Sequence, residues 1–199
     1  MKITNNHISF KVDDILMKSL TSDTWDDFEC LFGPKGAYAG CWCMWWRLSR
    51  KEFEKGQGEA NRQAMKSIVQ SGKIPGLITY DKDEPCGWCS VAPREHFSTL
   101  ERSRVLKRID NQEVWSIVCF FIKKNHRGKN LSLQLIQGAL DYVKSQGGKI
   151  VEAYPTILKT RKAPPVSTFM GIPSVLERAG FKIVHKPSQS KWIMRYFIR

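Results

Sequence analysis

The basic segment at residues 123–132 has the residue types of an anion-binding turn. Its sequence, KKNHRGKNLS, places Lys124, Arg127 and Lys129 directly before a predicted helix. The backbone N–H groups at a helix start carry partial positive charge and can hold a pyrophosphate, to which cationic side chains add charge. The alternative is a solvated basic loop that caps a helix, because runs of charge usually face water. The turn by itself leaves both interpretations open.

The cysteines could ligate a metal, form disulfides or pack as small apolar side chains. They are Cys30, Cys41, Cys43, Cys86, Cys89 and Cys119. Structural zinc sites usually separate paired ligands by two to four residues, so the pair at 41 and 43 is too close. The pair at 86 and 89 falls in a predicted strand, where we expect the two thiols on opposite faces. We therefore interpret all six as reduced thiols and expect no metal.

An aromatic segment lies at residues 36–47, and we expect it to form an ordered loop. It contains Tyr38, Trp42, Trp45 and Trp46, followed by Arg47. These rings could line an acceptor pocket or hold a cationic amine against their faces. The alternative is core packing, because Trp buries a large apolar surface.

The hydrophobic pattern predicts a mixed α/β sheet that positions these segments. We expect strands at residues 15–20, 77–80, 86–92, 114–122, 149–154, 181–185 and 192–198. We expect helices at residues 23–32, with Ser22 as the N-cap, at 59–70, from 131 to the glycines at 147 and 148, and at 173–179. The apolar run VWSIVCFFI at 114–122 is typical of a central strand, and a β-α-β crossover makes it parallel to 149–154.

Composition indicates one soluble domain over residues 1–199. The chain has 32 Lys and Arg against 19 Asp and Glu, a net charge of +13 that favours anionic partners. We attribute this charge to cofactor phosphates and a basic surface rather than to nucleic acid, because the basic residues are dispersed. No apolar run approaches the roughly 20 residues of a membrane helix, and the start lacks a signal-peptide core, so we expect a cytoplasmic protein without a membrane partner.

Several segments together resemble the GCN5-related N-acetyltransferase (GNAT) family. The coenzyme A motif of that family is Arg or Gln, two residues, Gly, one residue, then Gly or Ala at a helix start. Arg127 matches the first position, whereas Asn130 and Ser132 replace the small residues. Asn is the non-glycine residue most at ease at positive φ and can cap a helix, and Ser adds one small hydroxyl. The wider resemblance is to one branch of the family and rests on GCWCMWWR at 40–47, GWCSVAPR at 87–94, EAYP at 152–155 and the segment 171–181.

The resemblance implies a single GNAT-like domain, with a mixed central sheet splayed between two parallel strands and flanked by helices. It implies acetyl-CoA as co-substrate, no metal, and direct acetyl transfer to a primary amine of a small molecule or peptide. The implied cofactor-binding residues are Cys119, Phe120, Phe121, Ile122, Arg127, Gly128, Lys129, Asn130, Leu131, Ser132 and Leu133. A non-catalytic module that binds acyl-CoA or RNA is the alternative, and a homodimer is left open.

Acetyl transfer to an amine needs a base, because alkylamines with a pKa of about 10 are mostly protonated at neutral pH. Glu152 is the first candidate, since it lies on the strand that borders the implied splay, with Glu113 and Glu95 as alternatives. A structural ion pair is the competing role for Glu152. Many relatives place a Tyr acid before the last helix, where this chain has Phe169, so Tyr154 is the candidate acid.

Overall fold

The computed structural model describes residues 8–13, 15–157 and 165–199. The strands are β1 (Ser9–Val12), β2 (Ile15–Ser19), β3 (Leu77–Asp81), β4 (Glu84–Pro93), β5 (Trp115–Ile122), β6 (Ile150–Ala153), β7 (Lys182–Ser188) and β8 (Lys191–Phe197). The α-helices are α1 (Trp25–Phe32), α2 (Arg50–Lys55), α3 (Glu59–Gln70), α4 (Ser98–Glu101), α5 (Leu131–Ser145) and α6 (Pro173–Arg178). Short helical turns are η1 (Ser22–Thr24), η2 (Gly36–Gly40), η3 (Arg94–His96), η4 (Lys124–His126) and η5 (Pro165–Thr168).

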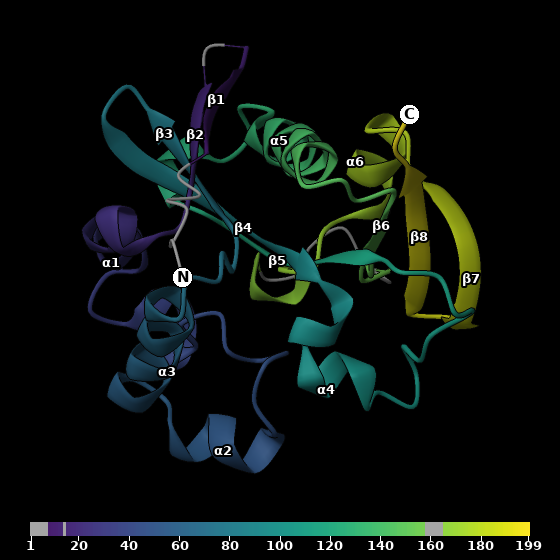
Figure 1. Cartoon of the computed structure of the whole chain (residues 1–199), viewed down its shortest axis with the longest axis horizontal. Helices are drawn as coiled ribbons and strands as arrows, with labels where there is room; N and C mark the ends of the chain where they lie inside the picture. The colour runs from purple at the N-terminus through teal and green to yellow at the C-terminus, as the bar shows by residue number, and fades with distance from the viewer. Residues whose placement is uncertain (1–7, 14, 158–164) are drawn as a thin grey trace.

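Within the described residues, the strands form one open sheet in the order β1-β2-β3-β4-β5-β6-β8-β7 (Figure 1). Strands β5 and β6 are parallel and are connected through α5, whereas the other neighbours are antiparallel. The predicted mixed α/β fold, with 114–122 near the centre of the sheet, is confirmed. None of the helices in the described parts of the chain is long and apolar enough to cross a membrane.

The predicted N-cap of the first helix is wrong. The chain makes the turn η1 before α1 begins at Trp25, and the side chain of Thr24 accepts a hydrogen bond from the Thr21 N–H at 2.9 Å. This bond between Thr21 and Thr24 stands in place of the cap expected from Ser22. Helix α2 was not predicted either, because its six residues bury only Phe53 and therefore show no apolar period.

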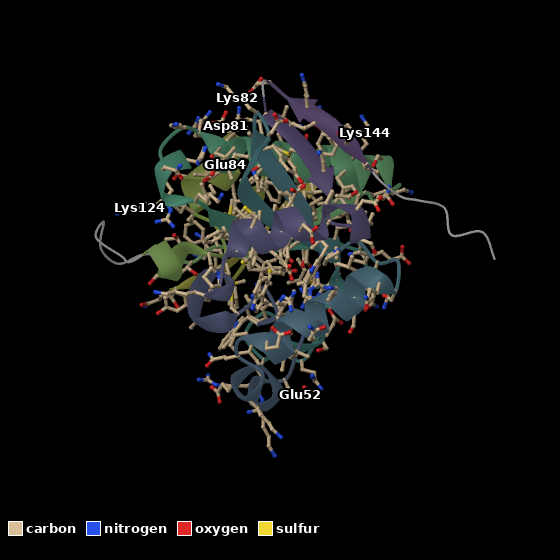
Figure 2. The ribbon with its side chains drawn as sticks, turned by 90° about the vertical axis from the view of Figure 1, so that its left-hand side faces the viewer. Glu52, Asp81, Lys82, Glu84, Lys124 and Lys144 are labelled. Carbon is tan, nitrogen blue, oxygen red and sulfur yellow. The ribbon has the colours of Figure 1, made fainter. Side chains whose placement is uncertain are left out.

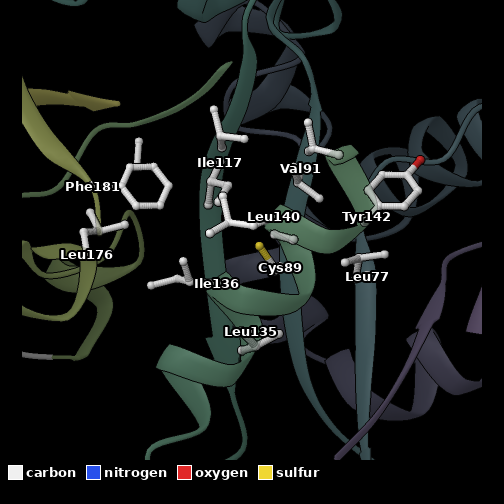
Figure 3. Packing of buried hydrophobic residues seen from close by; sticks show 14 of the residues in the cluster. Leu77, Cys89, Val91, Ile117, Leu135, Ile136, Leu140, Tyr142, Leu176 and Phe181 are labelled. Atoms are coloured by element: carbon white, nitrogen blue, oxygen red, sulfur yellow. The ribbon is translucent and has the colours of Figure 1, made fainter. Parts of the chain in front are cut away.

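Helices cover both faces of the sheet and create two apolar layers (Figure 1). Leu77 and Cys89 pack on the side of α5, as Figure 3 shows, whereas their neighbours Ile78 and Trp88 pack against α1 and α3. This alternation follows the two-residue period of a strand. The sheet is therefore buried on both sides near β3 and β4.

A β-bulge at Cys86 interrupts that alternation in β4. Thr79 faces Gly87 and Tyr80 faces Pro85, which leaves Cys86 between them without a partner on β3. The extra residue shifts the period by one, so Cys86 and Cys89 both enter the cluster beside α5. The prediction that their thiols face opposite sides is wrong for this reason.

A second bulge, at Val118, lies where the sheet opens. Ser90 faces Cys119 and Val91 faces Ile117, so Val118 has no partner on β4. Strand β6 pairs with β5 only over residues 115–117. The second half of β5, residues 118–122, therefore has no strand on its β6 side among the described residues, and the predicted splay between the parallel strands is confirmed.

Candidate active site

A cavity of about 790 Å³ lies along the open half of β5. Its wall combines the loop after α1, residues 119–122 of β5, the turn before α5, and the segment before α6. Its size is typical of sites that bind small ligands. The cavity thus joins the aromatic segment, the open strand and the basic turn, which are far apart in the sequence.

The open half of β5 presents main-chain groups and alternating side chains. Phe120 and Ile122 pack toward α5, and Cys119 and Phe121 pack toward α1. The Phe120 N–H donates to the carbonyl of Phe169 at 2.6 Å, and the carbonyl of Ile122 accepts a hydrogen bond from Arg127 Nε at 3.0 Å. Two main-chain groups of the open half of β5 are therefore already hydrogen-bonded within the protein.

Two side-chain contacts hold the basic turn against the hairpin formed by β3 and β4. Lys123 Nζ lies 2.9 Å from Glu84 Oε1, and His126 Nε2 lies 3.2 Å from Asp81 Oδ2. Figure 2 shows Asp81, Glu84 and Lys124 at the same edge of the molecule. These contacts hold the turn in front of the first turn of α5, whose backbone N–H groups have no partner within the helix.

Asn130 has the left-handed conformation expected of it, with φ 64°. It stands at the N-cap of α5, but its side chain does not cap the helix and instead accepts a hydrogen bond from Arg178 Nη2 at 3.1 Å. Arg127 and Ser132 line the cavity together with residues 119–122. The other predicted cofactor-binding residues of the turn lie outside this lining: Gly128, Lys129, Asn130, Leu131 and Leu133.

Glu152 and Tyr154 lie in a buried polar network and do not line the cavity. Arg94 Nη1 lies 3.1 Å from Glu152 Oε2, Arg195 Nε donates to Glu152 Oε1 at 2.8 Å, and the Tyr154 hydroxyl donates to Glu152 Oε2 at 2.6 Å. Burial and the nearby Glu152 charge raise the pKa of Tyr154 well above its usual value. The catalytic roles of both residues stay predictions, and the contacts favour the structural ion pair weighed as the alternative.

The two other carboxylates proposed as bases, Glu95 and Glu113, are exposed and are also absent from the cavity lining.

The aromatic side chains of residues 36–47 lie partly in the core and partly on the cavity wall. Trp42 stacks on Phe32 in the core, with ring centroids 5.7 Å apart, whereas Tyr38, Trp45 and Trp46 line the cavity. Core packing therefore holds for Trp42, and the acceptor-pocket role of the other three rings stays a prediction. Trp46 Nε1 is buried without a hydrogen-bond partner in the described structure, so a polar group is available at this wall.

The backbone of this loop is strained. Ala37, Ala39, Trp42 and Cys43 all have positive φ, between 41° and 65°. Such conformations cost of order 1–3 kcal/mol each and persist where surrounding structure enforces them. A Cβ on Gly40, also at positive φ, would lie 2.2 Å from the backbone nitrogen of Gly58, so only glycine lets the loop dock there.

Cys43 is the buried thiol of the cavity wall, and sequence reasoning missed it as a functional group. Trp88 Nε1 donates to Cys43 Sγ at 3.2 Å. The nearby Cys119 thiol, opposed by burial and aided by Trp88 and the charge of Arg47, lowers the pKa of Cys43 to about 7. The neighbouring Cys43 and burial raise the pKa of Cys119 well above its usual value.

All six cysteines are free thiols. Over residues 8–13, 15–157 and 165–199, the structure shows no group of three or more His, Cys, Asp or Glu side chains placed to hold a metal ion.

Comparison with known proteins identifies the family. The sequence profile of the Acetyltransferase (GNAT) family matches residues 38–162, while no curated protein matches the chain. The PaiA N-acetyltransferase of Thermoplasma acidophilum in complex with coenzyme A is 16% identical, with 92% of this chain and 98% of that chain covered and a TM-score of 0.52. Arylalkylamine N-acetyltransferase 2 of Aedes aegypti is 15% identical, with coverage of 94% and 100% and a TM-score of 0.55.

The aminoglycoside N(6')acetyltransferase of Legionella pneumophila is 17% identical, with coverage of 93% and 92% and a TM-score of 0.50. At such identities the structural likeness shows the fold alone. The family profile shows more, because it matches over half of the chain and includes the aromatic loop, the open half of β5 and the basic turn. The cavity is thus built mainly from the matched segment, and the chain belongs to the acetyltransferase (GNAT) family of enzymes.

Proposed function

We propose that this enzyme transfers an acetyl group from acetyl-CoA to a primary amine with an apolar body. The observation that carries the proposal is one continuous cavity with two different ends. Arg127 and Ser132 lie beside the start of α5 at one end, and Tyr38, Trp45 and Trp46 supply aromatic walls at the other. Residues 119–122 on the open half of β5 contribute to the wall of the same cavity.

The residues of the basic end fit the charged part of coenzyme A. Arg127 supplies a guanidinium, Ser132 a hydroxyl, and the first turn of α5 supplies backbone N–H groups, all suited to phosphate oxygens. Acetyl-CoA would supply the activated acetyl group as a thioester. Residues 119–122 would hold the pantetheine arm, and the bonds from Phe120 to Phe169 and from Arg127 to Ile122 must yield where that arm pairs with the strand.

The aromatic end supports an amine that carries an apolar or aromatic group. Tyr38, Trp45 and Phe53 line this end, and aromatic faces attract both apolar surface and cations. The arylalkylamine acetyltransferase of Aedes aegypti shares the fold and acts on amines of that kind by its name. The six free thiols fit a reducing compartment, so we place the reaction in the cytoplasm.

A screen of primary amines tests the proposal. Purified enzyme is incubated with acetyl-CoA and single amines, arylalkylamines and linear alkylamines beside polyamines, amino acids and aminoglycosides, and released coenzyme A and acetylated amine are measured by chromatography. We expect arylalkylamines to give the highest kcat/KM. Acetyl-CoA binding without acetylation of any amine would support the acyl-CoA-binding module instead, and acetylation confined to polycations would contradict the assignment of the aromatic end.

A further inference from the structure

The aromatic end of the cavity offers no carboxylate to an ammonium group. Its walls are aromatic rings, thiols and the amide of Gln57. Among the residues that the structure describes, none of the side chains lining the cavity is an Asp, Glu, His or Lys. In that described lining the charged side chain is the cation of Arg127, at the basic end. An ammonium group that enters the aromatic end therefore loses its hydration without gaining a carboxylate partner.

Several carboxylates of the elements around this end are paired with other side chains. Glu54 of α2 and Glu59 of α3 each lie 2.8 Å from an arginine of the same helix, and a tyrosine hydroxyl donates to Asp27 of α1 at 2.7 Å. Glu152 of β6 is held by two buried arginines. The sequence of residues 158–164, outside the described parts, is LKTRKAP and contains no acidic residue. The partners of these carboxylates all lie outside the cavity lining.

The titratable groups that do line the aromatic end are the phenol of Tyr38, which is 62% exposed, and three thiols. Burial raises the pKa of Cys41, and the neighbouring Cys43 and burial raise that of Cys119. Cys43, with a pKa of about 7, accepts a hydrogen bond from Trp88 Nε1 at 3.2 Å. Proton transfer to it from an alkylammonium with a pKa of about 10 is disfavoured about 10³-fold. The described walls from α2, α5 and the segment before α6 add no titratable side chain.

The chemistry of acetyl transfer makes the protonation state of the amine decisive. Only the neutral amine has the nitrogen lone pair that attacks a thioester. An ammonium group held against an aromatic ring would still have to lose its proton inside the cavity. A weakly basic amine gives its proton to water before it enters, so it needs neither a carboxylate nor a base there. The apolar, aromatic wall therefore suits a neutral acceptor.

We propose that the enzyme takes its acceptor as the neutral amine, and that its substrates are weakly basic primary amines with an aromatic body, such as α-amino amides. The inference rests on the proposed function and narrows its class of substrate. The amine nitrogen attacks the thioester carbonyl, the C–N bond forms, and the bond from the acetyl carbon to the coenzyme A sulfur breaks. The nitrogen loses one proton, through water, to the departing thiolate, which leaves as the coenzyme A thiol.

Two amines with the same phenyl group test the inference in the wild-type enzyme. Phenylalaninamide carries an α-amino group, with a pKa of roughly 8, and 2-phenylethylamine carries an alkylamine, with a pKa of roughly 10. Rates of coenzyme A release at saturating acetyl-CoA, corrected with enzyme-free blanks, give kcat and KM across this pH range. We expect KM to fall about tenfold per pH unit, up to about pH 8 for phenylalaninamide and about pH 10 for 2-phenylethylamine, while kcat stays constant.

The outcomes separate this inference from the proposed function. If the protein bound the ammonium form and then removed its proton, kcat would rise with pH in the same way for both amines, and the inference would be overturned. Acetylation of other amines but of neither of these two would also overturn it. Failure to acetylate any amine would overturn the proposed function instead.

A second measurement adds a carboxylate to the aromatic end. Gln57→Glu introduces a negative charge into the cavity lining, and Gln146→Glu introduces the same charge at the exposed C-terminal end of α5. At neutral pH we expect Gln57→Glu to lower KM for 2-phenylethylamine by about threefold, because the ammonium form then gains a partner. Gln146→Glu should leave KM unchanged. Equal KM values for the two variants would contradict the inference that the lining excludes the ammonium form.

Discussion

Buried charges of this enzyme are paired in two different ways. Arg94 and Arg195 share the carboxylate of Glu152, whereas Arg47 donates to the backbone carbonyls of Pro75 and His96. The carboxylate of Glu152 is committed to its partners and to the hydroxyl of Tyr154. These contacts favour a structural role for Glu152, and its role as a base stays a prediction.

The variant Glu152→Gln tests the structural role of Glu152. Removal of the charge leaves two buried guanidiniums short of a partner, so we expect a loss of about 3 kcal/mol of unfolding free energy. For a chain of this size, that loss corresponds to a fall in Tm of roughly 6–12 °C. Glu113→Gln, at an exposed carboxylate, is the matched control and should leave Tm unchanged. An unchanged Tm for Glu152→Gln with an acetyl-transfer rate about 10²-fold lower would restore the base role expected from the sequence.

The pH dependence of Cys43 alkylation follows from its pKa. The thiolate is the reacting form, and its fraction rises with pH through the pKa of about 7. The alkylation rate should therefore rise from acid pH, reach half its maximum near neutral pH and level off above it. For an ordinary thiol, with a pKa of about 8.5, the alkylation rate would still rise steeply with pH just above neutral. Peptide-resolved alkylation by iodoacetamide at a series of pH values measures this rate. A midpoint above pH 8 would contradict the lowered pKa of Cys43.

At the scale of elements, two single-residue bulges shape the site. The extra residue at Val118 marks the point where β5 leaves β6, and Cys86 reorients the thiols of β4. The apolar run 114–122 predicted the strand but not the bulge, because one additional apolar residue leaves the composition of the run unchanged. The positive φ values of Trp42 and Cys43 were equally unreadable, since neither residue type favours that conformation.

The start of α5 provides an element-scale prediction. Asn130 occupies φ 64°, which Gly adopts freely and a β-branched residue adopts only with strain. Asn130→Val should therefore lower the free energy of unfolding by about 1–2 kcal/mol in urea titrations. Asn130→Gly also loses the exposed bond to Arg178 but keeps the backbone geometry, so it should stay close to wild type. Equal stability of the two variants would show that the turn does not depend on this conformation.

For the whole molecule, the sequence was sufficient to predict the architecture but not which buried polar and charged side chains meet. Periodicity predicted α3, α5 and the crossover, because these elements bury continuous apolar faces. The hydrogen bond from Trp88 to Cys43 joins β4 to the loop after α1. The Glu152 network likewise joins Arg94 to strands β6 and β8. Such long-range contacts are set by packing and leave no periodic trace in the sequence.

Calorimetric titration with acetyl-CoA tests the central claim, that the cavity is an acetyl-CoA site, most directly. We predict one molecule bound per chain, with affinity about tenfold lower, or about 1.4 kcal/mol, in Arg127→Ala at low salt. Lys144→Ala removes the same charge from the other end of α5, far from the turn in Figure 2, and should bind as wild type does. Absence of binding, or equal affinity of Arg127→Ala and Lys144→Ala, would contradict the assignment of the site.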